Sequence, residues 1–473
     1  MPRLPHLHII GICGTAMAGL AALALEKGWQ VTGSDSGIYP PMSHFLRSLP
    51  IDLKETFSAD NLEPKPDLVL VGNAISRGNP ELEAVLDRNL PYRSGGQWLF
   101  ENVLEGLHPV VVTGTHGKTT TTSMIARLMH EAGWKPGFFI GGIPGDFGVG
   151  ARFPRSPWVV VEGDEYDTAF FDKRPKFLHY HPKTLILHNL EFDHGDIYPD
   201  LEAIRVQFRR LLRLVPANGQ VMANWDDAEV RDLTQGSRTP VVSYGLERDD
   251  CAYSARLHRP DGQHWSLWHN QKEVLQIHWQ LLGRHNVLNG LAAAATCLHH
   301  QMDPQWIKQG LERFQGVARR LQERFVVNDI HVYDDFAHHP TAMATTIDGL
   351  KCKVGSATRV WVVIEPRSNT MRSRAHQDRL PAALSQADRV LLTRPAARGL
   401  LPNQLLDVDL VVDRLNARQT GSEPIAKVVA NGIEAQEYLT QHLQKGDHVI
   451  IMSNGGFDGI HERLCASLNQ IHA

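Results

Sequence analysis

The segment PVVVTGTHGKTTTT, residues 109–122, combines the residue types that hold a phosphate group. Its valines are typical of a buried strand, and Gly114 and Gly117 precede Lys118 and Thr119 at the start of a helical pattern. Glycines let backbone N–H groups turn toward an anion, the helix N-terminus adds partial positive charge, and Lys118 adds a full charge. Thr119 can offer its hydroxyl to a magnesium ion. The segment therefore predicts a phosphate-binding loop.

The spacing of this loop departs from the usual P-loop, which places about four residues between its glycines. Only Thr115 and His116 stand between Gly114 and Gly117. The alternative is a Gly/Thr-rich turn before a helix, but the preceding strand and the lysine favour a phosphate site.

Acidic residues follow a second apolar run, PWVVVEGDEYD, with Glu162 at the end of the expected strand. A third run, KTLILHNLEFDH, is expected to end near Asn189 and His194. Ligands gather outside the carboxyl ends of strands in an open α/β sheet, so Glu162 and His194 are expected near the phosphate loop. Mg²⁺ prefers oxygen ligands and keeps several waters, which suits Glu162, Thr119 and phosphate oxygens, with His194 as a less usual ligand. For His194 the alternative is a hydrogen bond near Asp193. The other acids are interpreted as solvated loop residues: Asp164, Glu165 and Asp167.

The N-terminal run LHIIGICG is an apolar strand that enters a glycine turn, and a helical pattern follows. The turn matches a dinucleotide fingerprint imperfectly, because Cys13 stands where glycine is usual and Ala16 fills the small position. Asp35 lies about twenty residues further on, where a ribose-binding carboxylate is often found. We predict that the turn at Gly11 and Gly14 binds a ligand. The alternative is a tight strand-to-helix turn beside an exposed acid.

Strand and helix patterns alternate along the whole chain, which predicts an α/β protein. A length of 473 residues favours roughly three domains. We expect a Rossmann-like domain over 1–107, a P-loop ATPase-like domain over 108–316 and a doubly wound α/β domain over 317–473. In the first domain, strands are expected to end at Asp35 and Asn73. In the last, the expected strands are IHVYDD, RVWVVIE, RVLLT and DHVIIMSN, whereas segment 394–425 has weak periodicity and gives no prediction.

Composition excludes several classes of protein. A net charge of −4 argues against general nucleic-acid binding, so an anionic ligand needs a local site. No apolar run approaches the roughly 20 residues that span a bilayer, and no signal peptide is recognised, so we expect a cytoplasmic protein without membrane insertion. The five cysteines are scattered and contain no CxxC pair, which favours reduced thiols.

Taken together, the motifs resemble the Mur ligases, the ATP-dependent amide-forming enzymes of bacterial cell-wall precursor synthesis. The strings TGTHGKTTTT, EGDE, HNLEFDHGD, GRHNVLN, FQGVARR and VYDDFAHHPT occur in the family's order over essentially the whole chain. Other strings are similar to the subgroup that attaches a recycled tripeptide: GICGTAMAGLA, YPPMS, VGNAISRGNPELEAVL, EPRSNTMR and SNGGFDGIHE.

The resemblance implies roles for the matching residues. Those at the ATP site are Gly114, Thr115, His116, Gly117, Lys118, Thr119, Thr120, Asn286, Asn289, Arg320 and Asp335. The magnesium ligands would be Thr119, Glu162 and His194, and the catalytic set Lys118, Glu162, His194, Arg320 and Asp335. The residues near the uridine diphosphate would be Gly11, Gly14, Thr15, Asp35 and Asn73.

Two of these assignments leave alternatives open. Asn286 could simply cap the alanine-rich helix that follows it. Arg320 is preferred to Arg319 by alignment only. One departure is that no lysine occurs between His194 and Thr239, so the carbamylated lysine that holds a second magnesium in several Mur ligases is absent.

The resemblance implies a ligase that uses ATP and Mg²⁺ to join UDP-N-acetylmuramate to the murein tripeptide L-alanyl-γ-D-glutamyl-meso-diaminopimelate in peptidoglycan recycling. The γ-phosphoryl group would activate the sugar's carboxylate as an acyl phosphate, which the peptide's amine attacks. The first alternative is a ligase that adds free L-alanine to the same sugar. An NAD(P)-dependent oxidoreductase would leave the phosphate loop unexplained, and a non-catalytic UDP-sugar sensor would leave Lys118, Glu162 and Arg320 unexplained.

The last domain offers candidates for the incoming peptide. Arg367, Arg372 and Asn454 could hold its carboxylates, because the planar guanidinium fork binds carboxylate through two hydrogen bonds. His338 and His339 are candidates to accept the amine's proton, and a solvated loop pair is the alternative. Three substrates from three segments also predict that the last domain swings about a linker near Gly316. The sequence does not indicate an oligomeric state.

Overall fold

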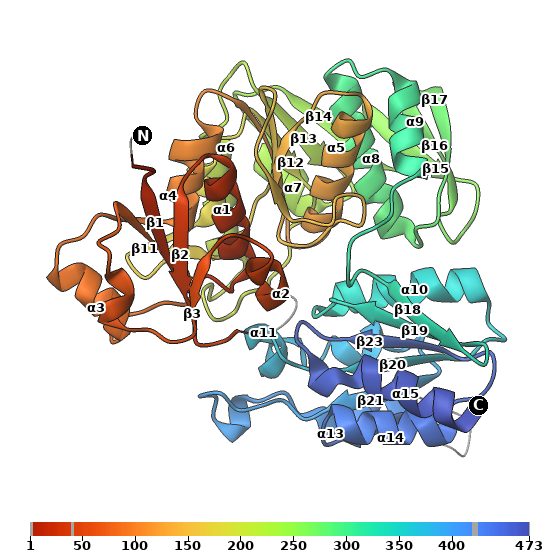
Figure 1. The fold of residues 1–473 in the computed structure, drawn as a ribbon. Helices are drawn as coiled ribbons and strands as arrows, with labels where there is room; N and C mark the ends of the chain where they lie inside the picture. Colours follow the sequence, from red (N-terminus) through yellow and green to blue (C-terminus); the bar gives the residue numbers. More distant parts are fainter. Residues whose placement is uncertain (1–2, 39–41, 419–423, 473) are drawn as a thin grey trace.

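The structure is a computed structural model that describes residues 3–38, 42–418 and 424–472. Three α/β domains follow one another along the chain, each built on a mainly parallel sheet (Figure 1). This confirms the predicted fold class. Residues 39–41 of the YPPMS string lie outside the described residues. Within the described part, none of the helices has the length and apolar character needed to cross a membrane. All five cysteines are free.

The N-terminal domain carries a five-stranded parallel sheet in the order β3-β2-β1-β4-β5. The order reverses between β1 and β4, and such a switch point is where a ligand crevice forms outside the strand ends. Its main elements are β1 (His6–Ile10), α1 (Thr15–Glu26), β2 (Gln30–Ser34), α2 (Met42–Arg47), β3 (Asp52–Lys54), β4 (Leu68–Val71), α3 (Pro80–Asp87), β5 (Tyr92–Ser94) and α4 (Gly95–Leu99).

Two strands of this domain end earlier than predicted. β2 stops at Ser34, so Asp35 lies just beyond it, and β4 stops at Val71, two residues before Asn73. After β4 the chain turns over the end of β1, where Gly72 N donates to Ile10 O over 2.9 Å. Asn73 therefore lies in the loop at the switch point and not in the sheet.

The central domain carries a ten-stranded sheet in the order β17-β16-β15-β14-β13-β12-β6-β9-β7-β8. The strands from β15 to β7 are parallel to one another, and β16, β17 and β8 pair antiparallel at the edges. Its elements are β6 (His108–Thr113), α5 (Lys118–Glu131), β7 (Gly137–Phe139), β8 (Ala151–Arg152), β9 (Trp158–Glu162), β10 (Asp167–Ala169), β11 (Asp172–Pro175), β12 (Thr184–Leu187), α6 (Leu201–Leu212), β13 (Gln220–Asn224), α7 (Ala228–Thr234), β14 (Val241–Leu246), β15 (Tyr253–Leu257), β16 (His264–His269), β17 (Lys272–His278), α8 (Arg284–His299) and α9 (Pro304–Glu312).

Both faces of the central sheet are buried, which explains its continuous apolar runs. Along β6, Val110 and Val112 pack with α5, α8 and α9, whereas Val111 points to the opposite face. That opposite face shares one core with α6, α7 and the N-terminal domain, including Trp98. The first two domains are therefore joined through a common apolar core.

The C-terminal domain carries a six-stranded sheet in the order β18-β19-β23-β20-β21-β22, in which β18 alone pairs antiparallel. The four strands predicted from the sequence correspond to β19, β20, β21 and β23. Segment 394–425, which gave no prediction, contains α13. The elements are β18 (Gln322–Val327), β19 (Ile330–Asp335), α10 (Pro340–Val354), β20 (Val360–Ile364), α11 (Asn369–Arg372), α12 (Leu380–Ala383), β21 (Arg389–Thr393), α13 (Val408–Asn416), β22 (Ala426–Val429), α14 (Gly432–His442), β23 (His448–Met452) and α15 (Ile460–His472).

The linker into this domain is fixed at its first residues. Gly145 N donates to Gly316 O over 3.0 Å, and Ala318 N donates to Ile143 O over 3.0 Å. Gly316 has a φ of +76°, which suits glycine. Gly316 and Ala318 are therefore hydrogen-bonded to the central domain in this arrangement, and the predicted swing of the last domain stays a prediction.

Candidate active site

The predicted phosphate loop connects β6 to α5. Gly114 has a φ of +136° and Gly117 a φ of +83°, conformations that side-chain-bearing residues rarely adopt. α5 begins at Lys118, and the first N–H groups of a helix have no acceptor within it. Thr120 is buried in the first turn. The loop therefore has the backbone geometry of an anion cradle.

The segment after β12 holds this loop from behind. Thr115 N donates to Asn189 O over 3.1 Å, and His116 N donates to Asn189 Oδ1 over 2.8 Å. Glu191 N donates to Thr115 Oγ1 over 2.9 Å. Sequence reasoning missed this supporting role of Asn189, although its position just after a buried strand was the available signal.

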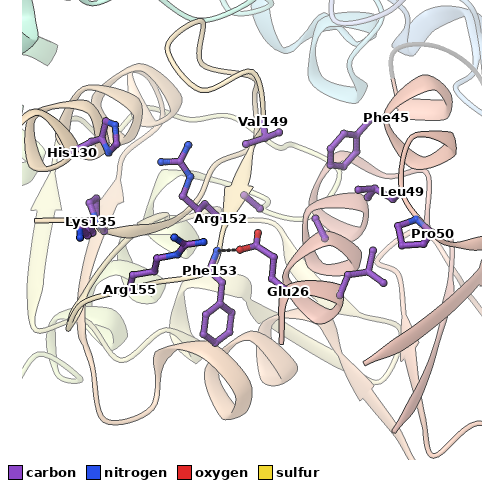
Figure 2. A pocket seen from close by; sticks show the side chains of 14 residues that line it. Glu26, Phe45, Leu49, Pro50, His130, Lys135, Val149, Arg152, Phe153 and Arg155 are labelled. Carbon is purple, nitrogen blue, oxygen red and sulfur yellow. Dashed lines mark hydrogen bonds between the residues drawn. The ribbon is translucent and has the colours of Figure 1, made fainter. Parts of the chain in front are cut away.

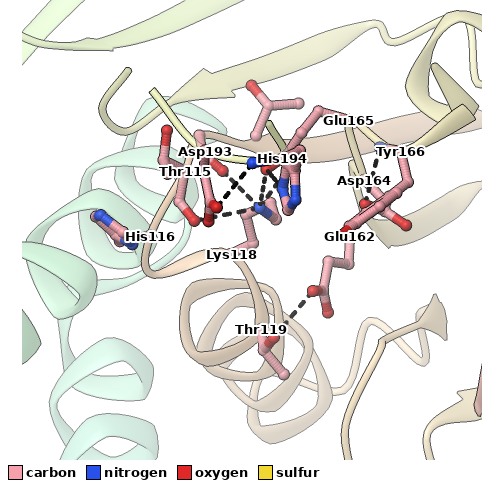
Figure 3. Close-up of polar contacts among 12 residues, drawn as sticks. Thr115, His116, Lys118, Thr119, Glu162, Asp164, Glu165, Tyr166, Asp193 and His194 are labelled. Carbon is pink, nitrogen blue, oxygen red and sulfur yellow. Dashed lines mark hydrogen bonds and ion pairs between the residues drawn. The ribbon is translucent and has the colours of Figure 1, made fainter. Parts of the chain in front are cut away.

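Lys118 is the centre of a buried polar network (Figure 3). Its Nζ donates to Gly114 O over 2.7 Å and lies 2.8 Å from Glu165 Oε2. His194 Nε2 lies 2.8 Å from the other oxygen of Glu165. Glu165 is 3% exposed, and its main-chain oxygen accepts a hydrogen bond from Tyr198. One carboxylate thus joins the lysine of the loop to the histidine.

The interpretation of Glu165 as a solvated loop acid was wrong. The chain after β9 folds back, so the Glu165 side chain points inward, which a loop pattern cannot reveal. Its two neighbours also have partners, because Asp164 lies 2.5 Å from Lys176 Nζ and Asp167 lies 2.7 Å from the exposed Lys173 Nζ.

Glu162 and Thr119 form a separate polar pair, drawn below the lysine network in Figure 3. Thr119 Oγ1 donates to Glu162 Oε1 over 2.9 Å, and Gly141 N donates to Glu162 Oε2 over 2.7 Å. A carboxylate beside a hydroxyl is the oxygen donor set that Mg²⁺ prefers, so these residues fit the ion. His194 faces Glu165 in this arrangement and fits less directly.

Burial and neighbouring charges shift the pKa values of Lys118, His194 and Glu162. Burial opposes the charge of Lys118, but Glu165 outweighs it, and the pKa of Lys118 is raised. Burial also opposes the charge of His194, and its hydrogen bond to Glu165 again prevails, so the pKa of His194 is raised. Burial raises the pKa of Glu162, with Lys118 acting against it. The network thus favours a charged lysine and a histidine that is more basic than usual.

Arg320 reaches this site from the linker to the C-terminal domain. Its Nη2 donates to Thr119 Oγ1 over 3.4 Å. Arg319 instead donates to the main-chain oxygens of Ser453 and Gly455 inside its own domain. The choice between these arginines rested on alignment alone, and the structure places only Arg320 at the phosphate loop.

Asp335 shapes the backbone next to Arg320. Its carboxylate accepts hydrogen bonds from Leu321 N and Ala337 N, both over 2.7 Å. Burial raises the pKa of Asp335, and Arg320 opposes that shift. The aspartate therefore fixes the turn after Arg320 and the start of the next loop.

The two asparagines of α8 lie beside the loop. Asn289 packs against Gly117, where a side chain at residue 117 would collide with its amide oxygen. Asn289 Nδ2 donates to Asn286 Oδ1 over 3.3 Å, and Asn286 Nδ2 donates back to Leu282 O over 2.8 Å. Asn286 is not a helix cap, because α8 begins at Arg284 after Gly283.

The N-terminal glycine turn lies between β1 and α1. Gly11 has a φ of +81°, Gly14 precedes α1, and Thr15 is exposed at its start. Asp35 holds the turn by accepting from Cys13 N and from Gly37 N, both over 2.9 Å. Figure 1 shows this domain on the same side of the molecule as α11 of the C-terminal domain.

A small cavity of about 180 Å³ lies in the C-terminal domain and contains two of the predicted peptide residues. Arg367 lines it and approaches Glu365 at 3.5 Å. Arg372 is buried and donates to Ala396 O and Ala397 O, so it also supports the loop that carries Arg398. Sequence reasoning missed Arg398, which follows an aperiodic run. The acidic lining residues are Glu365 and Asp458.

The third predicted peptide residue, Asn454, lies just after β23. Its buried Oδ1 has no hydrogen-bond partner among the described residues. Segment 365–372, which contains Arg367 and Arg372, also touches the central domain beside His194, because Gly195 N donates to Thr370 Oγ1 over 3.1 Å. This segment therefore connects the cavity to the polar network.

A second contact between these domains involves His116, Glu191 and His339, whose ligand atoms lie within 4.8 Å of one another. Glu191 already accepts from Thr341 Oγ1 over 2.8 Å and from Arg379 over 2.9 Å. His339 Nδ1 accepts from Thr341 N at 3.3 Å. We interpret these three residues as a polar contact between the domains and not as a metal site, because the charge of Glu191 is already balanced by Arg379.

The paired histidines of the DDFAHHP segment lie in this contact region, where His339 is buried and His338 is half-buried. His338 lies with Nδ1 3.0 Å from Phe336 O, and burial lowers the pKa of His338. Burial also lowers the pKa of His339. They are not a solvated loop pair, and both favour the neutral form.

Comparisons with known proteins give one consistent result. The family descriptions "Mur ligase family, catalytic domain", "Mur ligase middle domain" and "Mur ligase, glutamate ligase domain" match residues 6–104, 112–297 and 319–455. A protein of Escherichia coli named UDP-N-acetylmuramate–L-alanyl-γ-D-glutamyl-meso-2,6-diaminoheptandioate ligase is 43% identical over 98% of both chains. A protein of the same name from Haemophilus influenzae is 41% identical over 98% of this chain and 99% of its own. The crystal structure of a murein peptide ligase from Psychrobacter arcticus, 39% identical, superposes with a TM-score of 0.75 over 99% of this chain and 100% of that one.

Proposed function

The chain belongs to the Mur ligase family of ATP-dependent ligases, and we propose that it joins UDP-N-acetylmuramate to a tripeptide. The bond formed links the sugar's lactyl carboxylate to the amine of L-alanyl-γ-D-glutamyl-meso-diaminopimelate, with release of ADP and phosphate. The names of its relatives support this substrate pair over free L-alanine. We propose that the reaction takes place in the cytoplasm, where ATP is supplied, and that it belongs to peptidoglycan recycling.

The observation that carries the proposal is the convergence of Lys118, Glu162 and Arg320 on one glycine loop from separate segments. Lys118 and Arg320 bring positive charge to the place where a transferring phosphoryl group needs neutralisation. Thr119 and Glu162 would hold Mg²⁺, which supplies further charge neutralisation when bound.

Lys118 must exchange partners to do this work. In this arrangement the three donors of its ammonium are hydrogen-bonded to Gly114 O, Glu165 and, at the longer distance of 3.3 Å, Thr115 O. We infer that Glu165 keeps the side chain oriented across the loop while a phosphate oxygen replaces Thr115 O. His194 stays fixed to the other oxygen of Glu165, at the edge facing the C-terminal domain.

The acceptor acid comes from the first domain. We propose that the glycine turn at Gly11, Gly14 and Thr15, with Asn73 at the switch point, holds the uridine diphosphate, and that Asp35 keeps that turn in shape. Phosphoryl transfer to the carboxylate gives an acyl phosphate, a far better electrophile than the carboxylate itself. Closure of the C-terminal domain excludes water from this intermediate.

The peptide would enter from the C-terminal domain. We propose that Arg367 and Arg398 bind carboxylates of the peptide. The buried amide oxygen of Asn454 would accept a hydrogen bond from an N–H group of the peptide. Arg372 positions the loop that carries Arg398. We propose that His338 or His339, whose pKa values are lowered, accepts the amine's proton.

Product analysis tests the proposal. The protein is incubated with UDP-N-acetylmuramate, Mg·ATP and an equimolar mixture of tripeptide and L-alanine, and products are identified by mass spectrometry. The expected product carries the whole tripeptide, with one phosphate released per bond formed. Preferential formation of the L-alanine product would move the chain to the other subgroup, and phosphate release without either product would contradict the ligase assignment.

A further inference from the structure

A cavity lies between the N-terminal and central domains (Figure 2). It has a volume of about 700 Å³. One wall comes from α1 and α2, and the other comes from the end of α5 and from residues 149–155. The floor is well packed, since Gly19 of α1 is in contact with Phe139 and Ala151 of the central domain.

The central-domain wall is cationic without matching acids. Lys135, Arg152 and Arg155 line it, and none of them pairs with a carboxylate among the residues that the structure describes. Glu26 is the acid that lines the cavity, and it accepts a hydrogen bond from Phe153 N at 3.3 Å. Three positive charges therefore face one negative charge.

Arg152 is held in place without an ion pair. Its guanidinium lies over the rings of Phe138 and Phe147, 5.0 and 4.7 Å from their centroids. Burial lowers the pKa of Arg152, Glu26 acts in the opposite sense, and Arg155 adds a like charge nearby. An anion between the arginines would relieve that repulsion.

The facing wall is apolar. Leu25, Phe45, Leu49 and Pro50 come from the N-terminal domain, and Val149 closes one side. Sites for small molecules typically have volumes of about 300–1,000 Å³ and combine an apolar lining with a few polar groups. The cavity matches both properties and presents its polar groups on one side.

The position of the cavity separates it from the substrates. Glu26 ends α1, about 16 Å along the helix from Thr15 at the glycine turn. His130 lies near the end of α5, about 18 Å along that helix from Lys118. The cavity thus touches the far ends of the two helices whose first turns face the proposed nucleotides.

We propose that this cavity is a second binding site, for a small amphipathic anion with a sulfonate, carboxylate or phosphate head and an apolar body. The head binds Arg152, Arg155 and Lys135, and the body lies against Leu25, Phe45 and Leu49. This site does not depend on the proposed function, because none of its residues belongs to the phosphate loop or the peptide cavity.

Two matched fluorescent probes test the site in the full-length protein. 8-Anilinonaphthalene-1-sulfonate has the required head and body, and N-phenyl-1-naphthylamine has nearly the same body without the charge. Both are titrated at low ionic strength with saturating ATP and UDP-N-acetylmuramate present, so the substrate sites are occupied. The variants are Lys135→Gln with Arg155→Gln, both at exposed positions, and Arg213→Gln, at the exposed residue that follows α6, as a control for the loss of a surface charge elsewhere.

The expected result is one sulfonate probe per chain, bound about tenfold more tightly than the neutral probe. This ratio corresponds to about 1.4 kcal/mol of charge interaction that the neutral probe lacks. The double variant should lose that difference while binding the neutral probe unchanged, and Arg213→Gln should behave like the parent. Equal affinity for both probes, an unchanged preference in the double variant, or displacement by the two substrates would each overturn the proposal.

Discussion

Glu165 gives the sharpest test of how the phosphate loop is organised. The change Glu165→Gln keeps the shape of the side chain and removes its negative charge. Lys118 is then left buried with its nearest counter-charge gone, since Nζ lies 2.8 Å from Glu165 in the parent. His194 can release its proton in response, but Lys118 remains charged at neutral pH.

The magnitude follows from that geometry. At 2.8 Å the attraction between unit charges is about 6 kcal/mol for an effective dielectric constant near 20. Breaking a buried ion pair by removing one partner costs about 3–5 kcal/mol. Lys118 keeps its hydrogen bond to Gly114 O and remains near Asp164, so we expect the lower end, about 3 kcal/mol of unfolding free energy.

The assay is urea unfolding of the parent and two variants, followed by fluorescence. Asp167→Asn is the matched control, because this acid lies in the same segment and pairs with Lys173, whose side chain is 69% exposed. It should cost at most about 1 kcal/mol. If Glu165→Gln lowered the unfolding free energy no more than Asp167→Asn, the buried network would not hold the loop as described.

Three further predictions concern the same site. Arg320→Gln should lower kcat about 10²–10³-fold with little change in folding, measured by steady-state phosphate release, and a normal kcat would contradict its role at the phosphate. Gly117→Ala should abolish ATP binding in calorimetry. An alanine at this positive φ would cost about 1–2 kcal/mol, and its methyl group would collide with Asn289. Unchanged affinity for ATP would refute this. The pKa of His194 is raised in the folded protein, so its stabilisation is full below its ordinary value near 6.5 and is lost as pH rises through the raised value. The stability advantage over His194→Gln should therefore shrink as pH rises above about 6.5 in urea titrations, and an advantage that grew with pH would contradict the pairing with Glu165.

Local sequence patterns predicted the sheets and the glycine turn before Lys118 well, because these features depend on short-range physics. The valine run of β6 and the glycines before Lys118 require a strand and a left-handed turn whatever surrounds them. The apolar runs of the C-terminal domain gave four of its strands for the same reason. Strand ends were less predictable, because they depend on where the chain leaves the neighbouring strand. Asn73 illustrates this, since β4 ends at Val71.

The inward acids and the partners across domains were beyond local patterns. Glu165 and Asp167 lie in one acidic segment, yet one is buried against Lys118 and the other pairs with an exposed lysine. Only the path of the chain after β9 separates them. Arg398 escaped notice because its loop has no periodicity, and its position depends on hydrogen bonds from Arg372 to the neighbouring main chain.

The central claim is that the γ-phosphoryl group of ATP, bound at Lys118, is transferred to the sugar's carboxylate before the amide forms. UDP-N-acetylmuramate labelled with oxygen-18 in the lactyl carboxylate tests this directly during turnover with Mg·ATP and tripeptide. The account predicts one labelled oxygen in each phosphate released, read by mass spectrometry or by the isotope shift in phosphorus NMR. Phosphate that carries no label while the amide product accumulates would contradict it.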